Sequence, residues 1–571
     1  MTKRLKNYFI SLLAAIAIIP NMSRDFKQIK ESIASGAAAL DIGYYQRIFS
    51  ATNDLMNLEN FYVNFENDDF PRYSSFSLGE FFQRIGFLIL RENIIITYFT
   101  FTLFYLTLWI YFLTKTISIY NKKSISVNIL PVTILIMIFF GNNRIVDGYP
   151  FSRIISPQLG GLLWILGLYL ITNILVFQTR QKFSLKHFIQ FFVLVFVASF
   201  SYFFSFMALI GTGFVLVFYY FIKHQIKIAV VTLIGLAISS TPFFAVQLSD
   251  RDQIGFVHLS ERLGLVHDRL PGSLTVIIVC STILAFIVIK KLSTSISSHS
   301  PLFDAVMVIS TLGILFASQS NVVTNSSLIF SGHFEIFIWI NFILIFSFYL
   351  SKILTVSRLL TLNARLRVVI TSLLLIYPIS ELSSIASGTS IDMEKHLNVN
   401  LDDVENIIVD SSKFRNVLQV YSNSRILYRE DMYGQRISHQ ELLERYYISS
   451  GCDADVNFES LSNLFVYRSV AYKQRGESIK KYLGYFGMDR NFSFLYDRLI
   501  TEANEREKQI KSEIRKIQLN QIGCIDLAKK YGVDLIVYDN LSNWNKVINE
   551  LRLQPNVSGD WYKFNLRDLI E

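Results

Sequence analysis

The feature that most constrains the fold of this chain is the placement of its positive charges between apolar stretches. Loops rich in Lys and Arg alternate along the chain with loops that carry few of them. Because basic loops are retained on the cytoplasmic side of a membrane, this alternation predicts a chain that crosses a bilayer repeatedly. The basic loop positions are Lys3, Arg4 and Lys6; Lys115, Lys122 and Lys123; Arg180, Lys182 and Lys186; Lys223 and Lys227; Lys290 and Lys291; and Lys352, Arg358, Arg365 and Arg367.

The composition indicates the same class of protein. Apolar residues make up 51% of the 571 residues, which is more than one soluble core of this size could bury. The net charge of +9 does not predict nucleic-acid binding, because many of the cations belong to cytoplasmic loops beside anionic lipid headgroups. We therefore expect a multi-pass protein of a bacterial inner or plasma membrane, with a cytoplasmic N-terminus.

About eleven spans are predicted, followed by a soluble part. The fold class is thus mainly α: a transmembrane helix bundle over residues 1–386 and an exported α/β domain over residues 387–571. The first outer loop, 21–93, is unusually long. The predicted spans are roughly 8–20, 94–114, 125–141, 159–177, 187–205, 206–222, 228–246, 273–290, 303–318, 334–351 and 368–386.

Two amphipathic helices are predicted in the first outer loop. One begins at Asp25 and continues to Ile48, with apolar residues at steps of three and four, as in a helix that lies along the bilayer surface. The other covers Ser77–Arg91, with Glu80 and Arg84 paired on its polar side. The segment between them is predicted to be a polar loop.

The exported domain is expected to contain strands at Asn406–Asp410, Arg425–Tyr428 and Leu535–Tyr538. Its two cysteines, Cys452 and Cys524, lie in a compartment that permits oxidation, so they form a candidate disulfide. Sequence alone does not bring their α-carbons together, and the alternative of two free thiols stays open. The sequence contains no metal-ligand spacing, glycine-rich phosphate loop or nucleophile elbow.

The whole layout resembles the GT-C superfamily of membrane glycosyltransferases. The shared features are a first helix, a long outer loop with two surface helices and acidic residues, many further spans and an outer C-terminal domain. Five local phrases strengthen the resemblance: Asp41–Ile48, Asn67–Phe76, Ser152–Leu159, Ser320–Phe334 and Ala528–Asp539.

The resemblance implies transfer of a sugar from a polyprenyl-phosphate carrier to a glycan or protein acceptor on the non-cytoplasmic face. In this superfamily an acidic residue of the first outer loop acts on the acceptor as a general base or through a divalent metal. Asp41 is the leading candidate, and Asp69 and Asp25 are the others. Each has a simpler interpretation: Asp41 as a solvated carboxylate, Asp69 as part of a turn before Pro71, and Asp25 as a helix cap.

Cations are needed for the lipid phosphate, because negative charge accumulates on it as the bond to the sugar breaks. Arginine presents a bidentate fork to phosphate oxygens, so the outer-loop arginines are candidates, with Arg153 preferred for its place at a membrane boundary. Ordinary ion pairs would also explain some of them. His333, at the start of a span, is a candidate for contact with headgroup or sugar, or it packs as an interfacial aromatic ring. The substrate-binding candidates are Arg144, Arg153, Arg262, Arg269 and His333.

Two other functions compete with the glycosyltransferase. A transporter or flippase usually shows internal repeats and polar residues at mid-bilayer, whereas here the charged residues lie at the span ends. A noncatalytic protein of envelope polysaccharide assembly is the third hypothesis, because every candidate catalytic residue also has a structural interpretation.

Overall fold

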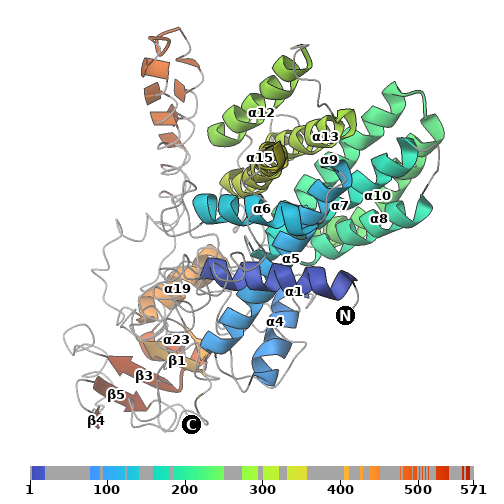
Figure 1. Cartoon of the computed structure of the whole chain (residues 1–571). Helices are drawn as coiled ribbons and strands as arrows, with labels where there is room; N and C mark the ends of the chain where they lie inside the picture. Colours follow the sequence, from blue (N-terminus) through green and yellow to red (C-terminus); the bar gives the residue numbers. More distant parts are fainter. Residues whose placement is uncertain are drawn as a thin grey trace.

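A computed structural model of the chain shows a helical bundle and a small mixed sheet (Figure 1). Most of the described residues are helical. Residues described are 3–19, 78–90, 94–121, 125–140, 158–179, 184–249, 273–292, 300–320, 331–356, 404, 406–409, 425–427, 438–449, separate positions between 473 and 512, 523–538, 556–558 and 561–565.

The bundle consists of long apolar helices whose sequences are hydrophobic nearly all round. Such helices need apolar surroundings on every side, which a bilayer supplies. Their bounds are α1 Lys3–Ile18, α4 Leu78–Ile89, α5 Ile94–Asn121, α6 Ile125–Phe140, α7 Gly160–Thr179, α8 Leu185–Ser199, α9 Phe203–Ile222, α10 Ile226–Ser249, α12 Leu274–Leu292, α13 Pro301–Ser318, and α15 Glu335–Val356, which follows the 3₁₀ turn η4 Ser331–Phe334.

Six of the described helices are long and apolar enough to cross a membrane, which agrees with a multi-pass protein. They lie in α5, α7, α9, α10, α12 and α13, and four shorter apolar helices occur at Leu5–Ile18, Asn128–Phe140, Leu185–Ser199 and Glu335–Ser351. The predicted span 368–386 lies outside the described residues, as does the predicted helix of Asp25–Ile48. The total of eleven spans therefore stays a prediction.

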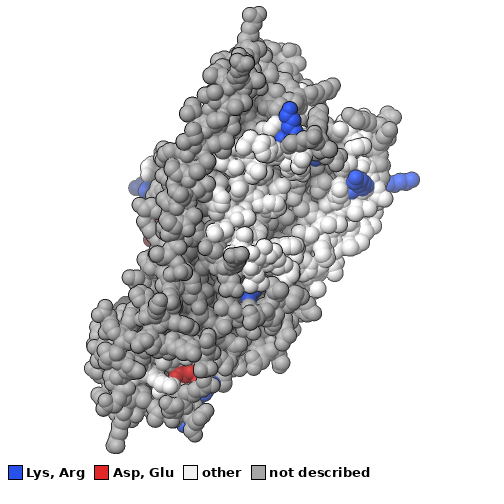
Figure 2. Space-filling view, turned by 60° about the horizontal axis from the view of Figure 1, so that its bottom comes forward, with Lys and Arg blue, Asp and Glu red and all other residues white. Residues whose placement is uncertain are grey.

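The surface of the bundle is apolar as well. Large hydrophobic side chains such as Ile222, Ile238 and Ile289 are each about two-thirds or more exposed, at 73%, 67% and 66%. Figure 2 shows that the described part of one face is largely free of charge, with Lys and Arg at separate points. A lipid environment would remove the free-energy cost of exposing these side chains.

Buried polar groups connect the helices inside the bundle. The indole nitrogen of Trp164 on α7 donates to Asn341 Oδ1 on α15 at 3.1 Å, and Asn341 Nδ2 donates to Ser310 Oγ on α13 at 3.1 Å. All three side chains are fully buried. These bonds satisfy polar atoms that would otherwise be costly in an apolar interior.

The helices α9 and α13 approach closely where two glycines meet. A Cβ at Gly211 would come within 2.4 Å of the Gly313 carbonyl oxygen, and a Cβ at Gly313 within 2.4 Å of the Thr212 Cα. Small residues let helix backbones approach closely in membranes, where dispersion contacts replace the hydrophobic effect.

Two predicted boundaries are wrong. The break expected at 205/206 lies instead between α8, which ends at Ser199, and α9, which begins at Phe203. Lys115, assigned to a cytoplasmic loop, lies inside α5, which continues to Asn121. The Thr114 and Ser118 hydroxyls donate to the carbonyls of Ile110 and Thr114, four residues earlier, so these polar side chains are satisfied within the helix and do not end it.

The sheet has the order β2-β1-β3-β5-β4, with parallel pairs β1–β2 and β1–β3 and antiparallel pairs β3–β5 and β4–β5. The strands are β1 Asn406–Val409, β2 Arg425–Ile426, β3 Leu535–Tyr538, β4 Asn556–Ser558 and β5 Trp561–Asn565. The first three occur where strands were predicted. Helices α19 His439–Ser449 and α23 Cys524–Lys530 accompany them, while the extent and export of a separate domain stay predictions.

Candidate functional site

Only His333 among the predicted site residues belongs to the described part of the chain. The three candidate acids Asp25, Asp41 and Asp69 lie outside it, as do Arg144, Arg153, Arg262 and Arg269. Cys452 lies outside it too, so the candidate disulfide is untested. Among the described residues, the candidate site therefore consists of His333 and its neighbours.

His333 lies in η4, the turn that leads into α15. Its Nδ1 is 2.6 Å from the hydroxyl of Tyr202, which ends the connection between α8 and α9. Its ring stacks on Phe204, with centroids 4.5 Å apart and planes at 14°. The hydrogen bond and the stacking together hold the imidazole in one orientation, and Nε2 is directed away from Tyr202.

Tyr202 is itself positioned by the first turn of α7. A Cβ at Gly160 would come within 2.5 Å of Tyr202 Cδ1, so only glycine leaves room for the ring. The hydroxyl of Ser205, one turn after Tyr202, donates to the Gly160 carbonyl at 2.9 Å. The start of α7 therefore carries the tyrosine that orients His333.

The same turn of α7 is bound to α5 through Gln158. The side-chain amide nitrogen of Gln158 is 3.2 Å from Thr102 Oγ1, and the backbone carbonyl of Gln158 accepts from Trp109 Nε1 at 2.9 Å. All three side chains are fully buried. Gln158, the last residue but one of the Ser152–Leu159 phrase, thus joins the start of α7 to α5 beside the Tyr202 and His333 pair.

The helix α4 occurs where the second amphipathic helix was predicted, but its orientation is inverted. Arg84, expected on the polar side, and its neighbour Gln83 are buried at 1% and 0% exposure, whereas Phe82 and Ile89 are 54% and 73% exposed. The Gln83 amide nitrogen reaches the Tyr105 hydroxyl on α5 at a long 3.5 Å. These two polar side chains thus pack inward with Phe87, while Phe82 and Ile89 face outward. The predicted Glu80 and Arg84 pair is untested, because the Glu80 side chain lies outside the described residues.

The start of α4 also connects to the turn before Tyr202. The amide nitrogen of Leu78 donates to the Phe200 carbonyl at 2.8 Å. Residues from α4, α5, α7, α9 and η4 therefore form one connected set of contacts, which we call the His333 cluster. Its members are Gln83, Thr102, Tyr105, Gln158, Tyr202, Ser205 and His333, and the buried Arg84 follows Gln83 on α4.

Sequence reasoning missed Arg84 as a site residue. The apolar stripe of α4 is the same for a helix that lies on a bilayer surface and for one that turns its polar side into a bundle. One sequence feature could have indicated this: Gln83 and Arg84 are adjacent polar residues on a helix that lies only a few residues before a predicted span. Charged residues in the apolar helices of a membrane protein usually face the interior of the bundle.

An acidic residue also lies close in sequence to His333. Glu335, half-buried in the first turn of α15, accepts a hydrogen bond from Ser273 Oγ at 2.9 Å. A carboxylate there is stabilised by the helix dipole, and the bond joins α12 to α15. Within the described ranges, no group of three His, Cys, Asp or Glu side chains could hold a metal ion, and the divalent metal stays a prediction.

The opposite ends of these helices hold described lysines. Lys186 begins α8, Lys223 ends α9, Lys227 begins α10, and Lys290 and Lys291 end α12. Hydrogen bonds join the helix ends there, between Asn121 and Ser351 at 3.1 Å and between Gln178 and Gln225. We call this the lysine end of the bundle. Its separation from the His333 cluster agrees with the alternation in the sequence.

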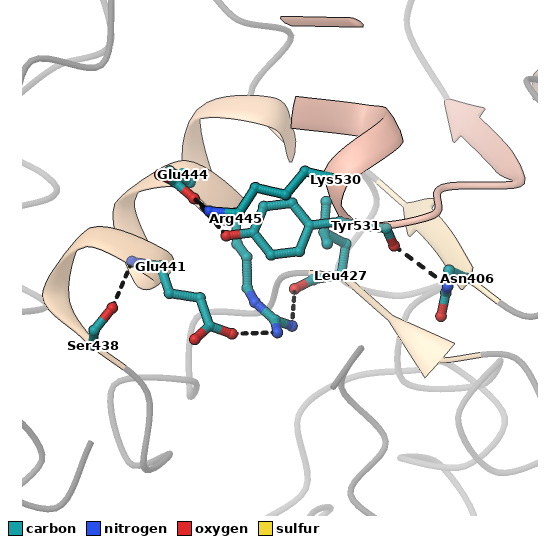
Figure 3. Close-up of polar contacts among 8 residues, drawn as sticks. All are labelled: Asn406, Leu427, Ser438, Glu441, Glu444, Arg445, Lys530 and Tyr531. Carbon is teal, nitrogen blue, oxygen red and sulfur yellow. Dashed lines mark hydrogen bonds and ion pairs between the residues drawn. The ribbon is translucent and has the colours of Figure 1, made fainter. Parts of the chain in front are cut away.

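A second polar network lies in the C-terminal part, between α19 and α23 (Figure 3). Glu444 accepts from Lys530 Nζ at 2.8 Å and from the Tyr531 hydroxyl at 2.6 Å. Glu441 pairs with Arg445, whose guanidinium also donates to the Leu427 carbonyl at 3.3 Å. Three of these side chains, Glu441, Glu444 and Arg445, are almost fully buried. The network connects two helices to the sheet, which is a structural role.

The pKa of the Glu444 carboxyl reflects two opposing causes. Burial raises it, because a charged group loses hydration, but hydrogen bonds from Lys530, Tyr531 and Gln440 lower it by more. The net pKa is lowered, so Glu444 stays ionised in the folded protein at neutral pH.

Comparison with known proteins adds no family to this description: the sequence matches no protein-family model and no curated protein.

Proposed function

We propose that this protein is a GT-C-type membrane glycosyltransferase that moves a sugar from a polyprenyl-phosphate carrier to an acceptor on the non-cytoplasmic face. The observation that carries the proposal is the buried Arg84 on α4, next in sequence to Gln83, whose amide reaches Tyr105 on α5. A buried arginine is a strong binding group for a phosphate that arrives from the bilayer.

In this reaction the sugar of the donor is attacked and its lipid phosphate is the leaving group. The acceptor oxygen forms a bond to the anomeric carbon, and the bond from that carbon to the phosphate oxygen breaks. The acceptor proton passes to a carboxylate, for which Asp41 is the leading candidate. The electron pair leaves with the polyprenyl phosphate, whose negative charge Arg84 stabilises.

His333 then positions the substrate. Its ring is held by Tyr202 and Phe204, so a donor group bound to it would occupy one defined place. Because Tyr202 depends on Gly160 for space, the first turn of α7 would influence the reaction without contact to substrate.

Sugar transfer by the purified full-length chain tests the proposal. Radiolabelled polyprenyl-phosphate sugars are supplied with membrane extracts as acceptor, and the wild type is compared with Asp41→Asn and Arg84→Gln. We expect Asp41→Asn to reduce kcat by about a hundredfold or more, since a positioned base contributes on that order. Arg84→Gln is expected to raise KM for the donor as well as lower kcat.

Matched controls separate these effects from damage to the fold. Asp526→Asn removes an exposed carboxylate in α23, and Arg490→Gln removes an exposed guanidinium in the C-terminal part. Both variants are expected to transfer sugar at the wild-type rate. The proposal fails if no polyprenyl-linked donor supports transfer, or if Asp41→Asn and Arg84→Gln both retain full activity.

A further inference from the structure

Two lysines at the lysine end of the bundle occupy equivalent places on two helices. Lys186 is the second residue of α8 and Lys227 is the second residue of α10, and both are exposed. Both helices begin at the lysine end and run towards the opposite end of the bundle. The proposed sugar transfer uses neither lysine.

The helices α8 and α10 lie side by side (Figure 1). A Cβ at Gly235 of α10 would come within 2.2 Å of the Phe192 ring on α8, so the two helices touch there. Phe192 comes six residues after Lys186, and Gly235 comes eight residues after Lys227. Because a helix rises by about 1.5 Å per residue, the two lysines differ in depth by only about 3 Å.

An exposed apolar stripe follows each lysine along its helix. The residues three and seven positions after each lysine are apolar, and such steps keep side chains on one face of a helix. Each of these side chains is about half exposed; they are Ile189 and Val193 on α8 and Val230 and Ile234 on α10. The two neighbouring stripes therefore form an apolar surface with a cation at the same end of each.

This part of the chain carries positive charge without any acidic residue. No Asp or Glu occurs between Asp147 and Asp250. The side chain of Gln178, at the end of α7, donates a hydrogen bond to Gln225, which lies between α9 and α10, so the two basic loops lie together. The cations of these loops are Arg180, Lys182, Lys186, Lys223 and Lys227.

Elsewhere at the lysine end the protein itself supplies the opposite charge. Lys290 Nζ on α12 lies 2.8 Å from Asp304 Oδ1 on α13, and only 3% of the lysine side chain is exposed. Lys186 and Lys227, in contrast, are exposed, and the sequences of α7, α8, α9 and α10 contain no carboxylate. An anion from outside the chain is therefore favoured beside these two lysines.

We propose that Lys186 and Lys227 together bind the phosphate of an anionic phospholipid from the leaflet at the lysine end, whose acyl chains lie along the apolar stripes of α8 and α10. Side chains lean towards the N-terminus of their helix, so both ammonium groups extend from the first turn towards the headgroups. The phosphate thus meets them at the membrane boundary.

The surface requires an amphiphile as its ligand. The two cations continue directly into apolar surface, which a free phosphate ion would leave uncovered. Basic positions between spanning helices suit acidic lipid headgroups, whose tails cover the adjoining apolar side chains. The ligand class is therefore a phosphodiester that carries acyl chains.

Lipid retention by the full chain tests this proposal. The protein is reconstituted in nanodiscs of phosphatidylcholine mixed with phosphatidylglycerol, and native mass spectrometry measures which lipid stays bound. The wild type is expected to retain phosphatidylglycerol preferentially. Lys186→Met and Lys227→Met are each expected to reduce that preference about fivefold, the effect of one basic side chain at an anionic surface.

The controls distinguish this surface from any other lysine at the membrane boundary. Lys186→Arg retains the cation and is expected to keep the preference. Lys291→Met removes an exposed lysine at the end of α12, next to the Lys290 and Asp304 pair, and is expected to change the preference little. Added inorganic phosphate is expected not to displace the lipid. An unchanged preference in either Lys186→Met or Lys227→Met, an equal loss in Lys291→Met, or displacement by phosphate would overturn the proposal.

A measurement on the wild type covers the case in which the methionine variants do not fold. Phosphatidylglycerol that carries a photoreactive group is incorporated into the discs, and the labelled peptides are identified. Labels in residues 186–193 and 227–234 support the site. Labels confined to other helices contradict it.

Discussion

At the scale of single residues, the chain places charge in apolar surroundings in different ways. Lys290 pairs with Asp304, Glu444 is held by Lys530 and Tyr531, and Arg84 is buried on α4 next to Gln83. The contacts of Lys290 and Glu444 offset a desolvation cost that an isolated charge could not bear. The role of a charged side chain therefore depends on the groups around it.

The Lys290 and Asp304 pair leads to a prediction about stability. Lys290→Met leaves Asp304 without its cation and is expected to destabilise the bundle by about 3 kcal/mol, the usual cost of breaking a buried pair. The double variant Lys290→Met/Asp304→Leu is expected to recover most of that loss. Thermal unfolding in one detergent measures all three proteins, and a double variant that is less stable than Lys290→Met would contradict the interpretation.

Glu444 leads to a prediction about pH. Its pKa is lower in the folded than in the unfolded state, so its stabilisation is present above the unfolded pKa and is lost as pH falls through the folded pKa. At neutral pH, Glu444→Gln is expected to cost about 2 kcal/mol, typical of hydrogen bonds to a charged group. Hydrogen exchange of the α23 peptide in the full chain measures this.

The difference between wild type and Glu444→Gln is expected to shrink in acid, because the wild-type carboxyl then becomes protonated. Glu505→Gln, at an exposed position, serves as the matched control and is expected to leave α23 exchange unchanged at every pH. A pH-independent difference for Glu444→Gln would show that lost packing, and not lost charge, is the cause.

At the scale of helices, close approach decides which elements pair. The crossing of α9 and α13 depends on Gly211 and Gly313, because a Cβ added at either glycine would come within 2.4 Å of a backbone atom of the other helix. Backbone atoms cannot rotate away, so the helices themselves must separate. The inverted orientation of α4 is also decided at this scale, by packing of Gln83 and Arg84 against the bundle.

Gly313→Ala is therefore expected to destabilise the bundle by about 2 kcal/mol through overpacking. Gly167→Ala is the matched control, because the atom nearest to its added Cβ is the Leu209 Cδ2, at the end of a flexible side chain. We expect the control to cost clearly less. Unfolding temperatures of the two variants in the same detergent measure the difference, and equal losses would contradict the backbone argument.

At the scale of the whole molecule, the helix ends form two chemically different sets. One end holds the His333 cluster, and the other holds lysines of α8, α9, α10 and α12. The positive-inside rule predicts that the lysine end faces the cytoplasm. On that orientation, and with the predicted span 368–386, the long loop 21–93 and the part after residue 387 are predicted to share the outer compartment.

Cysteine labelling in intact cells tests this topology. In a background without the native cysteines, Asn67→Cys and Tyr485→Cys are expected to react with an impermeant reagent. Lys223→Cys, at the lysine end, is expected to react only after lysis. The prediction fails if Asn67→Cys and Tyr485→Cys are found on opposite sides, because the proposed site and the C-terminal part would then be separated.

The sequence by itself determined the class of this protein. Charge alternation and apolar stretch length predicted a helical multi-pass bundle, and short apparent strands between helical stretches predicted three strands of the sheet, because both depend on local composition and periodicity. Only the tertiary structure decided that Arg84 faces inward, that Lys115 lies inside α5 among three rings, and that Tyr202 orients His333. Periodicity shows that a helix has two faces, but which face is buried depends on the neighbours that pack against it, and those neighbours are distant in sequence.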